Sequence, residues 1–290
     1  MQMFVTSEPA VALSEGQRTA LISLLADDDP AVYQLIKSKL LTFGPTALEW
    51  LRPYALSSEP KLRRRVLAFI ADETRRANHE RFVEYCRRKG EDLDLEEAAS
   101  HLASTRFPEI RHEGYTALYD AWANELSERV GSENSSTIVL DRINRFVFEE
   151  LGFRGDEHYA HEPESCYLNR IVDRRRGNPI GLCSIYLFLT RRLRLPVTGI
   201  GLPGHFICRY QDSKAEIYID CFRKGRFLTK ADCVKYLLRA NYGIADGHLS
   251  PVTPKRILLR MCNNLVSTYG HLEMAEEATK AQCYVKALTR

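Results

Sequence analysis

The sequence lacks the features that mark membrane and secreted proteins. The longest apolar run, residues 180–189, is too short to cross a bilayer. The first residues contain no basic stretch followed by an apolar core, as a secretion signal would require. The eight cysteines are scattered and include no Cys-x-x-Cys pair. We therefore expect a cytoplasmic protein with reduced thiols and no membrane partner.

The chain also lacks a strong charge of either sign. Its formal net charge is only +3 and its pI is about 8.4, which is too mild to demand a nucleic-acid partner. Three basic clusters, residues 63–65, 174–176 and 191–194, lie in helix-like stretches without interleaved aromatic residues. We interpret them as solvated helix faces and predict no nucleic-acid partner. Hydrophobic residues make up 44% of the 290 residues, enough for one large globular domain or two smaller ones.

The first 130 residues are predicted to form a helical lobe. Apolar residues recur at helical spacing, and Pro30 and Pro60 each stand where a helix would begin. The periodic positions are Val32, Leu35, Ile36, Leu40, Leu62, Val66, Phe69 and Ile70. A two-helix repeat resembling HEAT units and an irregular helical lobe both fit this pattern. Further helices are expected at residues 94–104 and 114–130, before a loop at residues 131–136.

A second region, residues 136–240, changes from helices to strands at Pro196. Helices are predicted at residues 138–151, 165–176 and 179–195, and Pro196 would end the last of them. Strands are predicted at residues 197–202, 205–210, 216–220 and 225–228, with an antiparallel hairpin turning at Lys214 and Ala215. Residues 241–290 are predicted to be helical again. The expected fold class is α+β.

Cys183, His205 and Asp220 stand in the order that a thiol nucleophile, its base and the orienting carboxylate would need. Asn178 and Pro179 form a good helix start, and a helix N-terminus stabilises a thiolate. If the helix begins at Pro179, however, Cys183 lies just past the first turn, where that effect fades. We expect Asp220 to accept the Nδ1–H of His205 across the hairpin. The alternative is that Cys183 is a small buried apolar residue, as free cysteines commonly are.

A metal site is the competing chemistry for these residues. Strand side chains alternate between the two faces of a sheet, so His205 and Cys208 point to opposite faces, and so do Asp220 and Cys221. No quartet of metal ligands is evident elsewhere in the sequence. We therefore predict neither a metal nor an organic cofactor.

Several segments of the sequence are similar to a known family. Residues 149–237 resemble the transglutaminase-like superfamily, in its bacterial SirB-type branch; the matching segments are residues 149–155, 167–180, 201–206, 219–222 and 225–228. This resemblance implies a papain-like core with the nucleophile at Cys183, the base at His205 and the orienter at Asp220. It also implies that residues 241–290 begin a tetratricopeptide-like region. Many SirB-type sequences carry serine at the position of Cys183, and those are expected to be non-catalytic.

Two functions follow from this pattern. In the first, Cys183 attacks the carbonyl of a protein or peptide amide, His205 delivers a proton to the leaving amine, and Asp220 orients His205. The backbone N–H of Cys183 and the side chain of Asn178 would hold the oxyanion. Water as acceptor makes the protein a protease or deamidase, which we favour over a transglutaminase. In the second, the same fold is a non-catalytic module that binds a protein.

Overall fold

The computed structural model describes residues 13–242 and 247–289, which belong to two compact units that divide between Ala77 and Asn78. The predicted division into residues 1–130, 136–240 and 241–290 stays a prediction. Residues 78–130, which the prediction assigns to the N-terminal lobe, lie in the second unit.

The first unit is helical, as predicted. Its helices begin where the sequence places proline, because Pro30 and Pro45 each occupy the first helical position and Asp29 caps its helix through the N–H of Ala31. The elements are α1 (Glu15–Ser23), η1 (Leu24–Ala26), α2 (Pro30–Leu41), α3 (Pro45–Leu51), η2 (Arg52–Leu56) and the start of α4 (Pro60–Lys89). Leu35 departs from the expected apolar face, since 69% of it is exposed.

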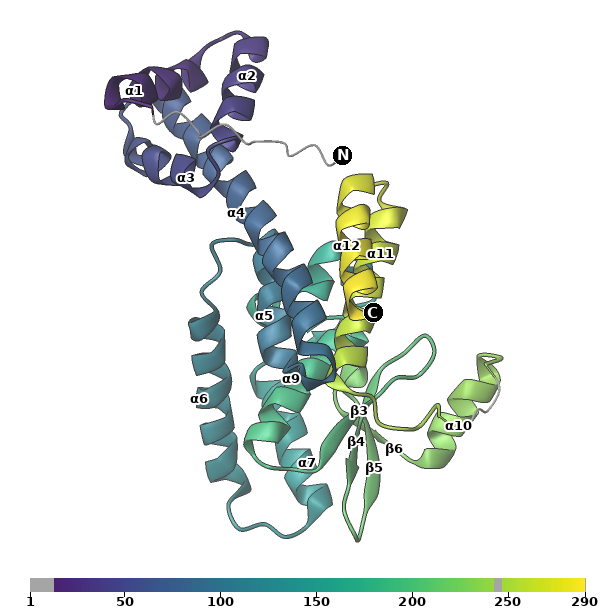
Figure 1. Cartoon of the computed structure of the whole chain (residues 1–290). Coiled ribbons are helices and arrows are strands. Elements are labelled where there is room, and N and C mark those ends of the chain that lie inside the picture. Colours follow the sequence, from purple (N-terminus) through teal and green to yellow (C-terminus); the bar gives the residue numbers. More distant parts are fainter. Residues whose placement is uncertain (1–12, 243–246, 290) are drawn as a thin grey trace, which may run out of the picture. The chain divides into compact units, whose positions relative to one another are not determined.

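The second unit contains most of the helices and all of the described strands (Figure 1). Its helices are η3 (Gly90–Asp92), α5 (Leu95–Arg106), α6 (His112–Val130), α7 (Ser136–Asn144), the π-helical η4 (Arg145–Glu150), η5 (Tyr159–His161), η6 (Pro163–Cys166), α8 (Leu168–Arg174), α9 (Pro179–Arg192), η7 (Cys221–Arg223), α10 (Lys230–Arg239), α11 (Pro254–His271) and α12 (Ala275–Leu288). The fold is mostly helical with one small antiparallel sheet, so the α+β prediction is confirmed. No helix in the described part of the chain is long and apolar enough to cross a membrane.

The main sheet has four antiparallel strands in the order β3-β4-β5-β6. They are β3 (Val197–Ile200), β4 (Ile207–Gln211), β5 (Glu216–Asp220) and β6 (Arg226–Leu228); β1 (Arg154–Gly155) and β2 (Arg176–Gly177) form a separate parallel pair. The predicted hairpin is confirmed, because Cys208 pairs with Ile219 across β4 and β5. His205, however, precedes β4 by two residues instead of opening it.

Two helices cover opposite faces of this sheet, and strand alternation decides which residues each helix meets. Ile207 and Tyr218 point toward α10 and share an apolar cluster with Cys233 and Leu237. Their neighbours Cys208 and Ile219 belong to the larger core, which contains the buried side of α9. In Figure 1, α10 lies beside β6 at one edge of the sheet. Each face of the sheet is therefore buried by a different helix.

The basic cluster at the end of α9 is an ion-pair network instead of the solvated face that we expected. Arg192 has only 17% of its side chain exposed, and its guanidinium contacts the Glu96 carboxylate at 2.7 Å. Arg191 reaches the same carboxylate at 2.9 Å. Glu96 lies on α5 and is itself 8% exposed, so a buried charge holds α5 to α9.

Candidate functional site

His205 and Asp220 meet beside the sheet. The Nε2 atom of His205 lies 3.0 Å from Oδ2 of Asp220, and both side chains are largely buried, 15% and 6% exposed. The nitrogen in contact is Nε2, so the expected Nδ1 contact is wrong. His205 lies in the turn before β4, and the nitrogen of its ring that is farther from the backbone, Nε2, meets the carboxylate. The other oxygen of Asp220 accepts the N–H of Arg223 at 3.2 Å, which holds the carboxylate in place.

Cys183 is enclosed in the protein core. Its side chain is 0% exposed, and its thiol donates a hydrogen bond to the carbonyl oxygen of Phe206, with Sγ and O 3.5 Å apart. In the part of the chain that the structure describes, no hydrogen bond joins Cys183 to His205. Burial raises the pKa of the Cys183 thiol well above its ordinary value, and contact with Cys208 raises it further. These surroundings favour a protonated thiol.

The start of α9 explains the depth of Cys183. Asn178 caps the helix, because its Oδ1 accepts the N–H of Gly181 at 2.8 Å, and Pro179 is the first helical residue. Cys183 follows four residues later, about 6 Å farther along the helix axis at a rise of about 1.5 Å per residue. Asn178 and Pro179 at the start of α9 line a cavity together with His205, whereas Cys183 is absent from the described residues that line it.

Asn178 has the capping role that the sequence predicts. Its Nδ2 donates to Ser165 Oγ at 3.4 Å, so both ends of the amide have protein partners. It also lines the cavity that contains His205. Its contribution to an oxyanion site stays a prediction.

Two adjoining cavities meet at the His205–Asp220 pair. One measures about 430 Å³ and the other about 530 Å³. Both are lined by His205, Asp220, Arg223 and Tyr236. Cys183 is absent from the described residues that line either cavity. We refer to the two cavities together as the His205 cleft.

Several residues of the His205 cleft carry no signal in the sequence. Tyr236 lies on α10, and its hydroxyl donates to the carbonyl of Pro203 at 3.0 Å, next to the turn that carries His205. Asn264 and Ser267 line the larger cavity from α11. The amphipathic pattern of α11 identifies its buried face, and these polar positions lie between the apolar ones. That pattern cannot tell which polar positions meet a cleft and which meet open solvent.

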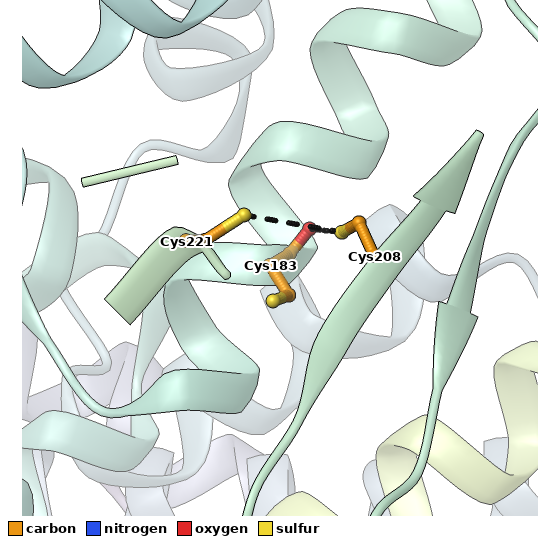
Figure 2. Close-up of side chains that lie close together, drawn as sticks. All are labelled: Cys183, Cys208 and Cys221. Carbon is orange, nitrogen blue, oxygen red and sulfur yellow. Dashed lines mark hydrogen bonds between the residues drawn. The ribbon is translucent and has the colours of Figure 1, made fainter. Parts of the chain in front are cut away.

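A group of three cysteines surrounds the enclosed thiol (Figure 2). Cys183 comes from α9, Cys208 from β4 and Cys221 from η7, and their sulfur atoms all lie within 4.8 Å of one another. The Cys221 thiol donates to the Cys208 sulfur at 3.9 Å. Strand alternation predicts that Cys208 faces away from His205. In agreement with this prediction, His205 is not among the residues of the cysteine group. Three thiols could bind a soft metal, but a structural zinc site needs a fourth ligand, and no fourth ligand joins the group in residues 13–242 and 247–289.

The comparison with protein families identifies the superfamily of the chain. The model of the transglutaminase-like superfamily matches residues 113–263, just over half of the chain. The chain belongs to the transglutaminase-like superfamily. The match covers β1 to β6 together with α7 to α10, so His205, Asp220 and the three cysteines lie inside the transglutaminase-like core. Asn264 and Ser267, which also line the larger cavity, lie just beyond the matched residues. The SirB-type branch stays a prediction.

Individual relatives agree with this family. The chain is 29% identical over 197 residues to a UPF0162 protein of Xylella fastidiosa, spanning 66% of this chain and 70% of the relative. It is 30% identical over 143 residues to a UPF0162 protein of Pseudomonas aeruginosa, 48% of this chain and 50% of the relative. It is also 33% identical over 142 residues to F-box only protein 21 of Mus musculus, 44% of this chain and 21% of the relative. No solved structure matches the chain.

Proposed function

We propose that this transglutaminase-like protein is a binding module whose His205 cleft holds a segment of a partner protein, and that Cys183 does not act as a nucleophile. The observation that carries this proposal is the enclosed position of Cys183. Its side chain is 0% exposed and its thiol is bonded to the backbone of Phe206. Of the two functions that the sequence leaves open, this geometry favours the non-catalytic one.

Acyl transfer requires a thiolate that can reach a carbonyl carbon. The pKa of Cys183 is raised by burial, so near neutral pH its sulfur is the protonated, weakly nucleophilic thiol. The Cys183 side chain is also enclosed in the core and is absent from the described residues that line the His205 cleft, where a substrate carbonyl would bind. Both the protonation state and the position of the Cys183 thiol are therefore unfavourable for attack on a substrate carbonyl.

The His205 cleft has the size of a ligand site. Its two cavities, about 430 and 530 Å³, fall within the range of about 300–1,000 Å³ that is usual for binding pockets. An extended peptide can place one side chain in each cavity. The His205 ring, which lines both cavities, then lies between these two side chains. The matched segment of this chain also makes up about a fifth of F-box only protein 21, where it is one part of a larger protein. The presence of a similar segment within a larger protein supports a binding domain that works together with other domains.

Thiol alkylation tests the proposal. We expect iodoacetamide to modify Cys183 of the folded protein at least about tenfold more slowly than Cys283, because a sealed thiol reacts only through local opening. Cys283 is the matched positive control, since it alone among the eight cysteines is partly exposed. Site-resolved mass spectrometry gives the rate at each cysteine, and a urea-unfolded sample normalises for intrinsic reactivity. Faster labelling at Cys183 than at Cys283 would exclude the binding module as stated.

Thiol-dependent acyl transfer is the second candidate, and the contact between His205 and Asp220 favours it. A base with its orienting carboxylate at 3.0 Å is the arrangement that such chemistry uses. This candidate requires the first turn of α9 to rearrange so that Cys183 reaches the His205 cleft. It predicts that Asp220→Asn slows the alkylation of Cys183 in a folded variant, whereas the binding module predicts no such slowing.

A further inference from the structure

The smaller cavity of the His205 cleft combines an apolar floor with a basic rim. The floor consists of Leu202, Ile207 and Leu228 from the sheet side and Cys233 and Tyr236 from α10. The rim carries four cationic side chains, Arg223, Arg226, Lys235 and Arg239, all of which are exposed. This combination differs from the larger cavity, whose lining is mainly neutral and polar.

Most of the cations of the rim form no ion pair within the protein. Arg226, Lys235 and Arg239 have no ion-pair partner among the residues that the structure describes. Arg223 lies 3.9 Å from Asp220 and keeps 65% of its side chain exposed. Three of the four charges are therefore free to meet an external anion.

The two acidic residues of this cavity already have partners. Asp220 accepts from His205 and from the N–H of Arg223. Asp232 belongs to the capping box of α10, where its carboxylate accepts from the backbone N–H and the hydroxyl of Thr229 at 2.9 and 2.7 Å. Neither carboxylate forms an ion pair with the cations on α10 or β6. Asp232, whose pKa is lowered first by its hydrogen bonds with Thr229, nevertheless lies close enough to Lys235 and Arg226 for their charges to help lower it. The rim thus presents an excess of positive charge to a ligand.

We infer that this cavity recognises an acidic segment of a protein, in which one apolar side chain enters the cavity and neighbouring Asp or Glu residues meet the rim. The inference rests on the proposed binding function and specifies its partner. The apolar floor needs an apolar side chain, and the unpaired cations need carboxylates on either side of it. Charge complementarity of this kind raises the association rate and sets specificity more than it raises affinity.

A protein segment fits this site better than a nucleic acid does. Bases are held by stacking on aromatic side chains, and the described residues that line the cavity include no Phe or Trp and only one Tyr, Tyr236, beside the His205 ring that contacts Asp220. The Tyr236 hydroxyl is bonded to Pro203, which fixes its ring in the wall. Leu238 on α10, 53% exposed, and Tyr242 after it, 49% exposed, are large exposed side chains of the same chain segment as the cavity wall.

Selection from a phage-displayed library of random peptides tests this inference. The full-length protein should enrich peptides in which an apolar residue is flanked by Asp or Glu. A selected peptide, labelled with fluorescein, should then bind at least about tenfold more weakly to the double variant Arg226→Glu/Arg239→Glu, and wild-type binding should weaken as salt is added. The matched control is Arg87→Glu/Arg88→Glu, which makes the same change of net charge at exposed positions of α4 outside the cavity.

A second variant separates failure of this inference from failure of the proposed function. Leu228→Trp fills the floor without changing the charge, and should abolish binding of the selected peptide. One outcome overturns acidic recognition and leaves the binding function standing. In that outcome the selected peptides lack acidic residues and bind the charge-reversed variant as tightly as wild type. They still fail to bind the Leu228→Trp variant. If no selected peptide is sensitive to Leu228→Trp, both are overturned. Circular dichroism establishes that each variant is folded.

Discussion

Raising the pH from about 8.5 to about 9.5 is expected to lower the free energy of unfolding by about 4 kcal/mol, a large part of the 5–15 kcal/mol that is typical of a folded protein. The cause is a set of buried thiols outside the three-cysteine group. Burial raises the pKa of Cys86, Cys166 and Cys233 to about 12 each. Burial also raises the pKa of Cys262 well above its ordinary value.

The sign of this effect follows from the protons bound in each state. Unfolded thiols lose their protons near pH 8.5, whereas the buried thiols of the folded protein keep theirs. Above that pH the unfolded state therefore binds fewer protons than the folded state, and stability falls as the pH rises. Between about pH 8.5 and about pH 9.5 each of the four thiols therefore contributes a loss of about 1 kcal/mol.

Urea unfolding under reducing conditions, followed by circular dichroism at the two pH values, measures the loss. Cys262→Ala should reduce the pH-dependent loss by about 1 kcal/mol, because one titrating buried thiol has been removed. Cys283→Ala is the matched control, since it removes a thiol that is already partly open to solvent. Equal stability at the two pH values, or the same loss in wild type and Cys262→Ala, would contradict the expectation.

Substitution of Gly155 by alanine is expected to destabilise the protein by at least about 3 kcal/mol and to abolish binding in the His205 cleft. A Cβ atom at this position would lie 2.3 Å from the carbonyl oxygen of Phe222 and 2.5 Å from its ring. The nearest atom belongs to the backbone, so no rotamer change relieves the overlap. The segment Cys221–Arg223 must move, and Asp220 directly precedes it.

Thermal and urea unfolding measure the stability of Gly155→Ala, and fluorescence anisotropy measures binding of a selected peptide. Gly114→Ala is the matched control, because Gly114 lies in α6 and a Cβ there meets nothing within 4 Å. That variant should be as stable as wild type or more stable by up to about 1 kcal/mol, since alanine favours a helix over glycine. Wild-type stability in Gly155→Ala would mean that β1 and η7 pack less closely than the structure indicates.

Much of the fold could be predicted from local sequence signals. The cap at Asn178, the proline at the start of α9 and the hairpin between β4 and β5 all follow from residues close together in the chain. Alternation along strands also predicts that Cys208 and Cys221 turn away from His205 and Asp220. The same local logic failed for Leu35, which follows the helical period but is exposed, because no element of the described chain covers that side of α2.

The sequence by itself determined that Cys183, His205 and Asp220 are candidates for one site, and only the tertiary structure decided which of them meet and which other residues line the cleft. Cys183, His205 and Asp220 stand in the order that a catalytic triad needs, but order along the chain does not measure depth. The structure brings His205 to Asp220 and leaves Cys183 one turn inside α9, against Cys208 and Cys221. The physical reason is that helix and strand patterns specify which way a side chain points, whereas the distance between a helix and a sheet depends on the packing of the whole core.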